Sequence, residues 1–241
     1  MQFRLTEAFR TLGLSSYALN QLSEFGDLLL GSKTNVSGLR TAEEIEELHF
    51  LDSLSLLRLQ VVRDAHEVVD VGSGGGLPSV VLAIAQPNTR VIALDSVGKK
   101  CRFVEFAASK LGLGNLQVIC ERAEELGRGE GRERFDVATS RALAALPVVA
   151  ELTLPLVKMG GHMVAMKGAL SDQERIDGEF ALAILGGGQL EELQIVPFPG
   201  ADNRWLHVAQ KESATSARYP RRVGVPAKQP LNAHEAVSGG S

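Results

Sequence analysis

The residues best suited to chemistry form one short run, Asp70-Val-Gly-Ser-Gly-Gly-Gly-Leu77-Pro78. The run follows an apolar segment with a strand pattern, His66–Val71, and precedes a helical pattern that opens at Pro78. Glycines between a strand and a helix let backbone amides approach a ligand closely, and a helix N-terminus favours negative charge. The sequence therefore predicts a loop that binds a nucleotide-like ligand.

The spacing of the glycines bears on which ligand this is. A dinucleotide-binding loop requires G-x-G-x-x-G, and Gly72 and Gly74 supply two glycines but Leu77 takes the third position. Asp95 ends the next strand-like run, where a carboxylate accepts hydrogen bonds from ribose hydroxyls of NAD and S-adenosylmethionine alike. The compact G-x-G-x-G form after Asp70 favours S-adenosylmethionine, whose sulfonium and ammonium groups are attracted to carboxylates. A glycine loop that only makes a tight turn is the alternative.

Three further segments place polar side chains at predicted strand ends. Glu124, in Glu121-Arg-Ala-Glu124, follows the third strand, and the carboxyl edge of an open α/β sheet is where ligands bind. Arg141 ends the fourth strand and can stack on a base or clamp a phosphate. Lys167 ends the fifth strand. For each cation, an ordinary surface ion pair is the alternative, and for Glu124 the alternative is a solvated charge at the start of a helix.

Alternating strand and helix patterns position these residues. Continuous apolar runs separated by helical patterns predict an α/β fold with a parallel sheet covered on both faces. The segments Gln189–Phe198 and Arg204–Lys211 predict an antiparallel hairpin at one edge. The other predicted strands and the clearest helix are His66–Val71, Arg90–Asp95, Leu116–Cys120, Phe135–Thr139, His162–Met166 and the helix Gly98–Leu111.

The segments on either side differ from this pattern. Residues 1–65 are predicted to be helical, with apolar residues at helical spacing up to Gly31 and a capping box formed by Thr41 and Glu44. The acidic run Glu43–Glu47 is interpreted as a solvated first turn. Residues 213–241 are predicted to form an extended basic tail on the domain. The expected division is therefore 1–65, 66–212 and 213–241.

Composition excludes several classes of protein. With 241 residues, 44% apolar and 22% charged, the chain is globular and not disordered. The two cysteines, Cys101 and Cys120, are too few for a disulfide framework, lack the spacing of a zinc site and are expected to be buried. The charged N-terminus does not match a signal peptide, and Glu151 interrupts the most apolar segment. We expect a soluble cytoplasmic protein with no metal and no membrane partner.

Several motifs in a fixed order carry a resemblance to one family. The chain resembles the small-subunit ribosomal RNA methyltransferase G family, also called glucose-inhibited division protein B. The matching segments are His49-Phe-Leu-Asp-Ser-Leu54, the glycine loop, Leu94-Asp-Ser96 with Lys99-Lys100, Arg122-Ala-Glu124, Ser140-Arg-Ala142, Met166-Lys-Gly168 and Tyr219-Pro-Arg-Arg-Val-Gly-Val-Pro226.

The resemblance implies a reaction and a site. It implies a Rossmann-like, seven-stranded S-adenosylmethionine-dependent methyltransferase fold with an N-terminal helical extension. It also implies methyl transfer to N7 of a guanine in the 530 loop of 16S rRNA, on the RNA or on a small ribosomal subunit particle. One departure from many members is Ser79 after the Leu-Pro pair, where we expect the cofactor site to survive. Implied cofactor contacts are Gly72, Leu77, Ala123, Glu124 and Arg141, with Asp95 at the ribose position; Gly74 joins them from the loop pattern, and Arg141 with Lys167 are the candidate catalytic residues.

The chemistry of guanine N7 agrees with the residues present. N7 carries a lone pair and no proton, so its methylation needs positioning rather than a general base. After the fourth strand stands Thr139-Ser-Arg-Ala142, not the Asn/Asp-Pro-Pro-aromatic motif of exocyclic-amine methylation. Two alternatives stay open: a methyltransferase for a small molecule, and a non-catalytic nucleotide-binding regulatory module.

A chain with formal net charge −4 needs a local basic surface to bind RNA. From Arg204 to the C-terminus it carries six basic and two acidic residues. We hypothesise that this tail is an arm that grips phosphates through Arg218, Arg221, Arg222 and Lys228, helped by Lys99, Lys100 and Lys167 near the cofactor. The alternative is a tail packed on the sheet with solvated arginines.

Overall fold

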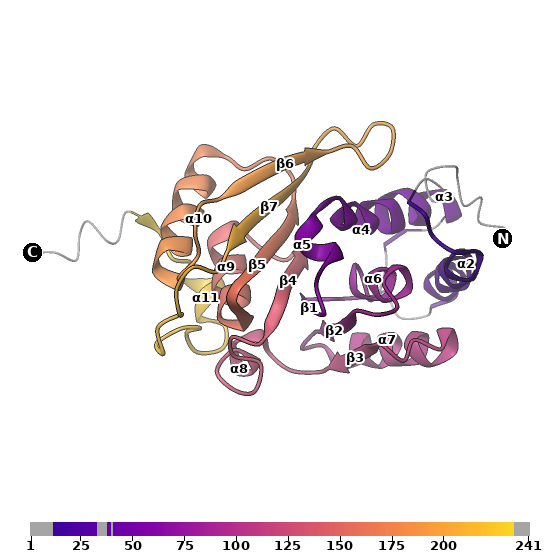
Figure 1. The fold of residues 1–241 in the computed structure, drawn as a ribbon, viewed down its shortest axis with the longest axis horizontal. Coiled ribbons are helices and arrows are strands. Elements are labelled where there is room, and N and C mark those ends of the chain that lie inside the picture. The colour runs from indigo at the N-terminus through magenta and orange to yellow at the C-terminus, as the bar shows by residue number, and fades with distance from the viewer. Residues whose placement is uncertain (1–11, 33–37, 40, 234–241) are drawn as a thin grey trace, which may run out of the picture. The chain divides into compact units, whose positions relative to one another are not determined.

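The computed structural model describes residues 12–32, 38–39 and 41–233, and the chain divides into two compact units. Unit 1 contains the residues up to Cys120 together with Val196–Asp202, and unit 2 contains Glu121–Ile195 and the residues from Asn203 onward (Figure 1). The predictions for the charged N-terminal segment 1–11 and for the end of the tail, 234–241, lie outside the described residues.

The helical character predicted for the first 65 residues is confirmed in the part that is described. Ser15 Oγ caps the first helix by accepting a hydrogen bond from the Ala18 amide at 3.1 Å. The predicted capping box is present, with Thr41 and Glu44 bonded to each other's amides. One expectation is wrong, because Glu46 is 5% exposed and not solvated. The elements are α2 (Ser16–Gly31), α3 (Ala42–Ile45), the π-helix η1 (Glu46–Leu51), α4 (Asp52–Leu54), the 3₁₀-helix η2 (Ser55–Arg58) and α5 (Gln60–Arg63).

Unit 1 continues with three parallel strands and two longer helices. The strands are β1 (Glu67–Val71), β2 (Arg90–Leu94) and β3 (Leu116–Ile119), in the spatial order β3-β2-β1. The helices are α6 (Ser79–Ala85) and α7 (Gly98–Leu111). Four of the five residues are buried in both β1 and β2, as expected for parallel strands covered on both faces.

Unit 2 contains the remaining described strands in the order β4-β5-β7-β6. Strands β4 (Phe135–Arg141) and β5 (Val157–Lys167) are parallel. Strand β7 (Arg204–Gln210) is antiparallel to both β5 and β6 (Glu191–Ile195), so the predicted edge hairpin is confirmed. The helical elements are α8 (Ala123–Leu126), α9 (Leu146–Thr153), the 3₁₀-helix η3 (Leu154–Leu156), α10 (Asp172–Leu185) and α11 (Val225–Lys228).

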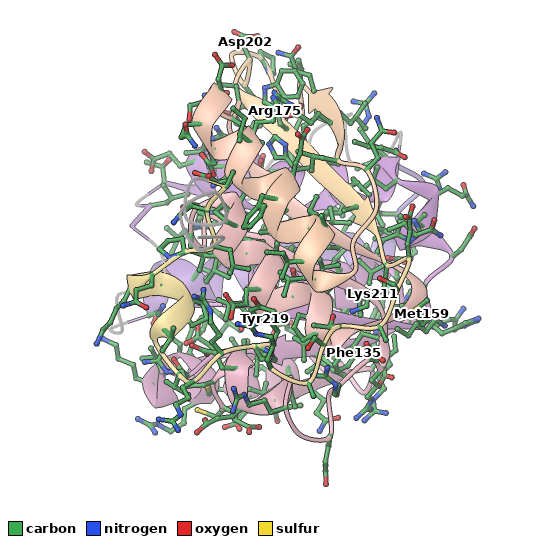
Figure 2. All side chains as sticks on the ribbon, turned by 90° about the vertical axis from the view of Figure 1, so that its left-hand side faces the viewer. Phe135, Met159, Arg175, Asp202, Lys211 and Tyr219 are labelled. Atoms are coloured by element: carbon green, nitrogen blue, oxygen red, sulfur yellow. The ribbon has the colours of Figure 1, made fainter. Side chains whose placement is uncertain are left out.

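The core of unit 2 includes a residue from the tail. Side chains of α9 and α10 pack against β5 and β7, and these helices lie on one side of those strands in Figure 1. Tyr219 joins this cluster and is only 6% exposed. Figure 2 shows the segment that leads from Lys211 past Tyr219 to the yellow α11. Tyr219 therefore attaches the tail to the core of the unit.

Two histidines of unit 2 make its stability depend on pH. Burial lowers the pKa of His162 and of His207 from the ordinary value of 6.5. The unfolded chain therefore binds protons near pH 6.5, whereas the folded chain binds them only at lower pH. The contribution of these two histidines to the free energy of unfolding is therefore fully present above pH 6.5, and it is lost as the pH falls toward their pKa values in the folded chain.

Replacing His162 by Gln should make this loss shallower, because it removes one of the two histidines whose pKa is lowered by burial in the folded chain. The measurement is the free energy of unfolding by urea at several pH values from about 5 to 8. Above pH 7.5 the variant should show the same pH dependence as the wild type. Equal slopes below pH 6.5 would contradict the role of burial at His162.

Candidate functional site

The glycine loop of unit 1 has backbone angles that explain its composition. Gly72, Gly74 and Gly76 have φ of +76°, +58° and +88°, a region in which residues with a Cβ are strained. The amides of Gly72 and Ser73 donate hydrogen bonds to the Leu94 carbonyl at 2.8 and 3.0 Å. The loop after β1 is thus fastened to the end of β2.

Asp95 lies beside this loop, as predicted. Its Oδ2 accepts a hydrogen bond from the Gly74 amide at 2.9 Å, and its Oδ1 accepts one from the Val97 amide at 2.8 Å. The side chain is 8% exposed, and Lys100 Nζ lies 3.8 Å from Oδ2. Because each carboxylate oxygen has two lone pairs, Asp95 can hold the loop and still accept a ligand hydroxyl.

Asp70 and Leu77 support the loop from within. Asp70 is fully buried, and its Oδ2 accepts a hydrogen bond from the Ser79 amide at 3.0 Å. This gives Asp70 a role at the start of α6 that the sequence did not predict. Leu77 is 5% exposed and its amide donates to the Ser73 carbonyl at 3.0 Å. Ser79 begins α6, so the departure from the common family pattern leaves the local structure intact.

The two sides of the loop differ in the room that they leave. A Cβ placed on Gly74 would have only the Gly72 carbonyl oxygen nearby, at 3.9 Å. A Cβ on Gly76 would lie 2.4 Å from Val80 Cγ2. Gly76 is therefore required by packing, whereas the space beside Gly74 is open to a ligand that approaches the backbone.

The cysteines of unit 1 differ in exposure. Cys101 is buried and donates to the Asp95 carbonyl at 3.2 Å, whereas Cys120 is exposed, so the expectation that both are buried is wrong for Cys120. Cys120 directly follows β3, where little packs on its side chain. Burial and the neighbouring Cys120 raise the pKa of Cys101 to about 12. The Cys101 thiol is therefore protonated at neutral pH and does not act as a nucleophile.

In unit 2, Ala123 and Glu124 lie on the short helix α8. Both are buried, and Glu124 is 6% exposed. Glu124 Oε1 accepts a hydrogen bond from the Gly224 amide at 2.8 Å. The sequence did not reveal this partner, because one hundred residues separate the two positions.

Arg141 and Lys167 end the neighbouring strands β4 and β5, where Arg141 is in register with Met166. The structure thus brings the two candidate catalytic residues to the same end of two paired strands. Arg141 is partly exposed. Lys167 Nζ donates to the Ala144 carbonyl at 2.7 Å and lies 3.1 Å from Glu174 Oε1.

Glu174 extends this contact to the next helix. Its Oε1 also accepts a hydrogen bond from the Leu146 amide, the first residue of α9, at 2.8 Å. Lys167 and Glu174 therefore hold the turn between β4 and α9. Glu174 is a supporting residue that sequence reasoning missed, since its charge alone does not distinguish it from the other acids of α10.

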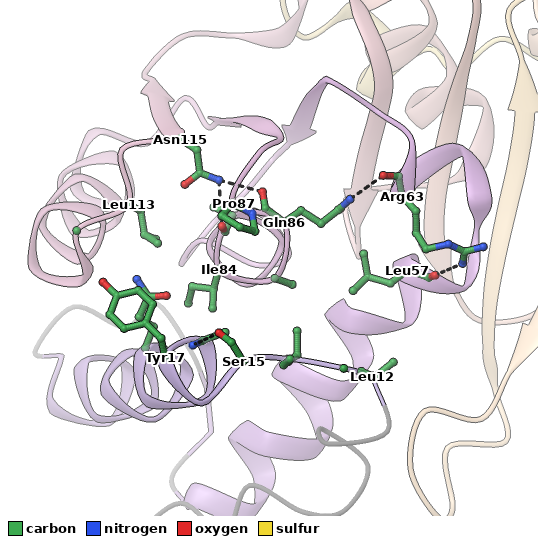
Figure 3. Close-up of a pocket in the computed structure, with 17 residues that line it drawn as sticks. Leu12, Ser15, Tyr17, Leu57, Arg63, Ile84, Gln86, Pro87, Leu113 and Asn115 are labelled. Atoms are coloured by element: carbon green, nitrogen blue, oxygen red, sulfur yellow. Dashed lines mark hydrogen bonds between the residues drawn. The ribbon is translucent and has the colours of Figure 1, made fainter.

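A cavity in unit 1 lies apart from the glycine loop. Its volume is about 530 Å³, and Figure 3 shows its walls: α2 with Tyr17, the end of α6 with Ile84, and the turn that contains Leu113. Asn115 closes one wall, with its Nδ2 donating to the carbonyls of Ala83, Gln86 and Thr89 at 3.0, 3.2 and 3.0 Å. None of the predicted site residues lines it.

The described part of the chain lacks two kinds of feature. Within residues 12–32, 38–39 and 41–233, no group of three or more His, Cys, Asp or Glu side chains is placed to hold a metal ion. Over the same ranges, no helix combines the length and apolarity that crossing a membrane requires.

Comparison with known proteins gives a consistent result. A family model described as rRNA small subunit methyltransferase G matches residues 18–196. The ribosomal RNA small subunit methyltransferase G of Rubrobacter xylanophilus is 44% identical over 218 residues, which cover 88% of this chain and 84% of that protein. The protein of the same name from Geobacillus thermodenitrificans is 39% identical over 234 residues, covering 95% and 98%.

The solved structures support the fold. The apo form of the S-adenosylmethionine-dependent methyltransferase SibL matches with a TM-score of 0.56 at 14% identity, covering 82% of this chain and 70% of that one. At this identity the likeness concerns the fold alone. It confirms the predicted Rossmann-like methyltransferase fold.

Replacing Gly74 by Val should weaken binding of S-adenosylmethionine by more than about tenfold, because the new side chain fills the open space beside the loop. Isothermal titration calorimetry measures this affinity. The matched control is Gly13→Val, since Gly13 also has a positive φ of +72° with nothing within 4 Å of a Cβ. Both variants carry similar backbone strain, so equal affinities for the cofactor would contradict a ligand at Gly74.

Proposed function

The chain belongs to the rRNA small subunit methyltransferase G family, and from this premise we propose that it transfers a methyl group from S-adenosylmethionine to N7 of a guanine in the 530 loop of 16S rRNA. The observation that carries the proposal is the match of relatives over nearly the whole chain, at 39% identity across 95% of it. Those relatives favour an rRNA substrate over a small molecule and an enzyme over a regulatory module.

The residues of the glycine loop fit the cofactor. The open space beside Gly74 and the buried carboxylate of Asp95 form a cradle next to backbone amides. We propose that S-adenosylmethionine, which supplies an electrophilic methyl group, is bound by residues that the sequence singled out. These are Gly72, Gly74, Leu77, Asp95, Ala123, Glu124 and Arg141.

The reaction at N7 requires alignment more than proton transfer. The lone pair of N7 lies in the plane of the base, so the rate depends on placing it in line with the methyl group. We propose that Arg141 contacts the target base or its phosphate. Lys167 supports this placement by holding Ala144 and Glu174, which fixes the turn that follows Arg141.

The contacts of the tail correct the hypothesis of a phosphate-gripping arm. Arg221 makes a bidentate ion pair with the fully buried Glu151, so its charge is already neutralised by a carboxylate. The guanidinium carbon of Arg218 lies 5.3 Å from the ring centre of Tyr219. Arg222 and Lys228 are exposed, and we propose that these two cations contact RNA phosphates.

The proposed reaction is assigned to one part of the chain. We propose that residues 66–212 carry the methyltransferase machinery, that residues 1–65 form a helical extension and that residues 213–241 form a C-terminal segment. The alternation of strands and helices between β1 and β7 supports the bounds 66 and 212 for the methyltransferase part.

The proposal also covers the substrate and the place of action. The substrate is the RNA or a small ribosomal subunit particle, and the protein acts in the cytoplasm.

Mapping of N7-methylguanine in 16S rRNA, with and without the protein, tests the reaction. Because N7 has no proton to lose, the single-turnover rate should be flat between about pH 6 and pH 8. A rate that falls about tenfold per pH unit below pH 7 would indicate a general base and contradict methylation at N7.

Removing the two exposed tail cations in Arg222→Ala/Lys228→Ala should weaken RNA binding. It should also flatten the slope of log affinity against log salt by roughly 1.5, since each phosphate contact contributes about 0.7 to 0.9. The control is Arg134→Ala/Lys158→Ala. It removes two exposed cations at the N-terminal ends of β4 and β5, whereas Arg141 and Lys167 lie at the C-terminal ends of these strands. Identical salt slopes for the two double variants would contradict phosphate contacts at the tail.

A further inference from the structure

A buried ion pair fixes the C-terminal segment to unit 2. Glu151, on α9, has no exposed surface. Arg221 Nε donates to Glu151 Oε1 at 2.9 Å, Arg221 Nη2 donates to Oε2 at 2.6 Å, and the Arg221 amide donates to Oε1 at 2.8 Å. Three donors of one residue thus neutralise a carboxylate that water does not reach.

The same guanidinium also fixes a second point of the chain. Arg221 Nη2 donates a hydrogen bond to the Gln229 carbonyl at 2.8 Å. Residues 221 and 229 are therefore held by one side chain, and the segment between them forms a closed loop. We name residues 221–229 the C-terminal loop.

The middle of the C-terminal loop contacts a predicted cofactor residue. Gly224 has φ of +79°, and its amide donates to Glu124 Oε1 at 2.8 Å. Glu124 is 6% exposed, so this backbone amide is part of a buried contact. Since glycine adopts this φ without strain, the residue type at 224 suits the direction of the amide.

The chain before the loop is attached to the residues that follow α8. Arg128 Nε donates to the Pro220 carbonyl at 2.7 Å, and Arg132 Nη1 donates to the Tyr219 carbonyl at 2.9 Å. A Cβ on Gly127 would lie 3.3 Å from Pro220 Cγ, so the two segments pack closely. The C-terminal loop and the segment of Glu124 are therefore joined at several points.

We propose that Arg221 is a positioning residue of the cofactor site, acting through Gly224 on Glu124. By closing the C-terminal loop, Arg221 keeps the Gly224 amide on Oε1, which fixes the direction of the Glu124 carboxylate before the cofactor binds. A carboxylate held in place loses less freedom on binding than a mobile one, and affinity rises accordingly. The proposal rests on the proposed function, because it takes Glu124 as a contact of S-adenosylmethionine.

The first test is Arg221→Lys, which keeps a positive charge for Glu151. A lysine has a single ammonium and cannot replace the planar guanidinium that reaches both Glu151 and Gln229. We expect a dissociation constant for S-adenosylmethionine about tenfold higher than that of the wild type. The KM for the cofactor should rise by the same factor while kcat at saturating cofactor stays unchanged. Arg218→Lys, three residues away and exposed, is the matched control and should bind as the wild type does.

A second variant covers the case in which Arg221→Lys fails to fold. Glu151→Met/Arg221→Met removes both buried charges together, and apolar pairs of similar volume often replace buried ion pairs without loss of stability. It opens the C-terminal loop in a folded protein. We expect the same tenfold loss of cofactor affinity, measured by calorimetry well below the melting temperature.

A double-mutant cycle distinguishes positioning from a merely structural role. If Arg221 acts through Glu124, the losses of cofactor affinity in Arg221→Lys and Glu124→Gln should not add in the double variant. Additive losses, or wild-type affinity in the folded Arg221 variants, would overturn the proposal while leaving the proposed function intact. Absence of cofactor binding by the wild type would instead overturn the proposed function, and this inference with it.

Discussion

A carboxylate without exposed surface requires a partner, and Glu151 imposes this requirement on unit 2. The free-energy cost of an unpaired charge in an apolar interior is larger than the net stability of a typical folded domain. Arg221 meets the requirement, and in doing so it brings Tyr219 to the core cluster and Gly224 to Glu124. The course of the C-terminal segment thus follows from one residue in the middle of α9.

Other carboxylates of the protein also bind donors of other segments, through hydrogen bonds from backbone amides. Four carboxylates each accept a hydrogen bond from the backbone amide of a loop or of a helix start: Asp70 from Ser79, Asp95 from Gly74, Glu124 from Gly224 and Glu174 from Leu146. Hydrogen bonds to a charged acceptor are stronger than neutral ones. These four acidic side chains therefore anchor the backbone, and Asp95 and Glu124 are also proposed contacts of the cofactor.

The sequence predicted most of what depends on local pattern. Strands, the capping box at Thr41 and the glycine loop have short-range signals, and the register of β1 and β2 places Asp95 beside Gly74. The partner of Arg221 could not be predicted, because a basic residue between prolines looks the same whether it faces phosphate or a buried acid. The one available signal was Glu151 itself, a lone acid in the most apolar segment of the chain. Burial of Glu46 and exposure of Cys120 likewise depend on packing between distant segments.

The pairing of Glu151 with Arg221 also affects when unit 2 can fold during synthesis of the chain. Seventy residues separate the two partners. At a synthesis rate of about 5 to 20 residues per second, Arg221 is added to the chain roughly 4 to 14 s after Glu151. Helices, by comparison, form within microseconds. During this interval α9 exists without its counter-charge, so the interior of unit 2 closes only when the growing chain has passed Arg221. Unit 1 has its strands β1 to β3 by residue 119 and does not wait for that step, except for the segment Val196–Asp202.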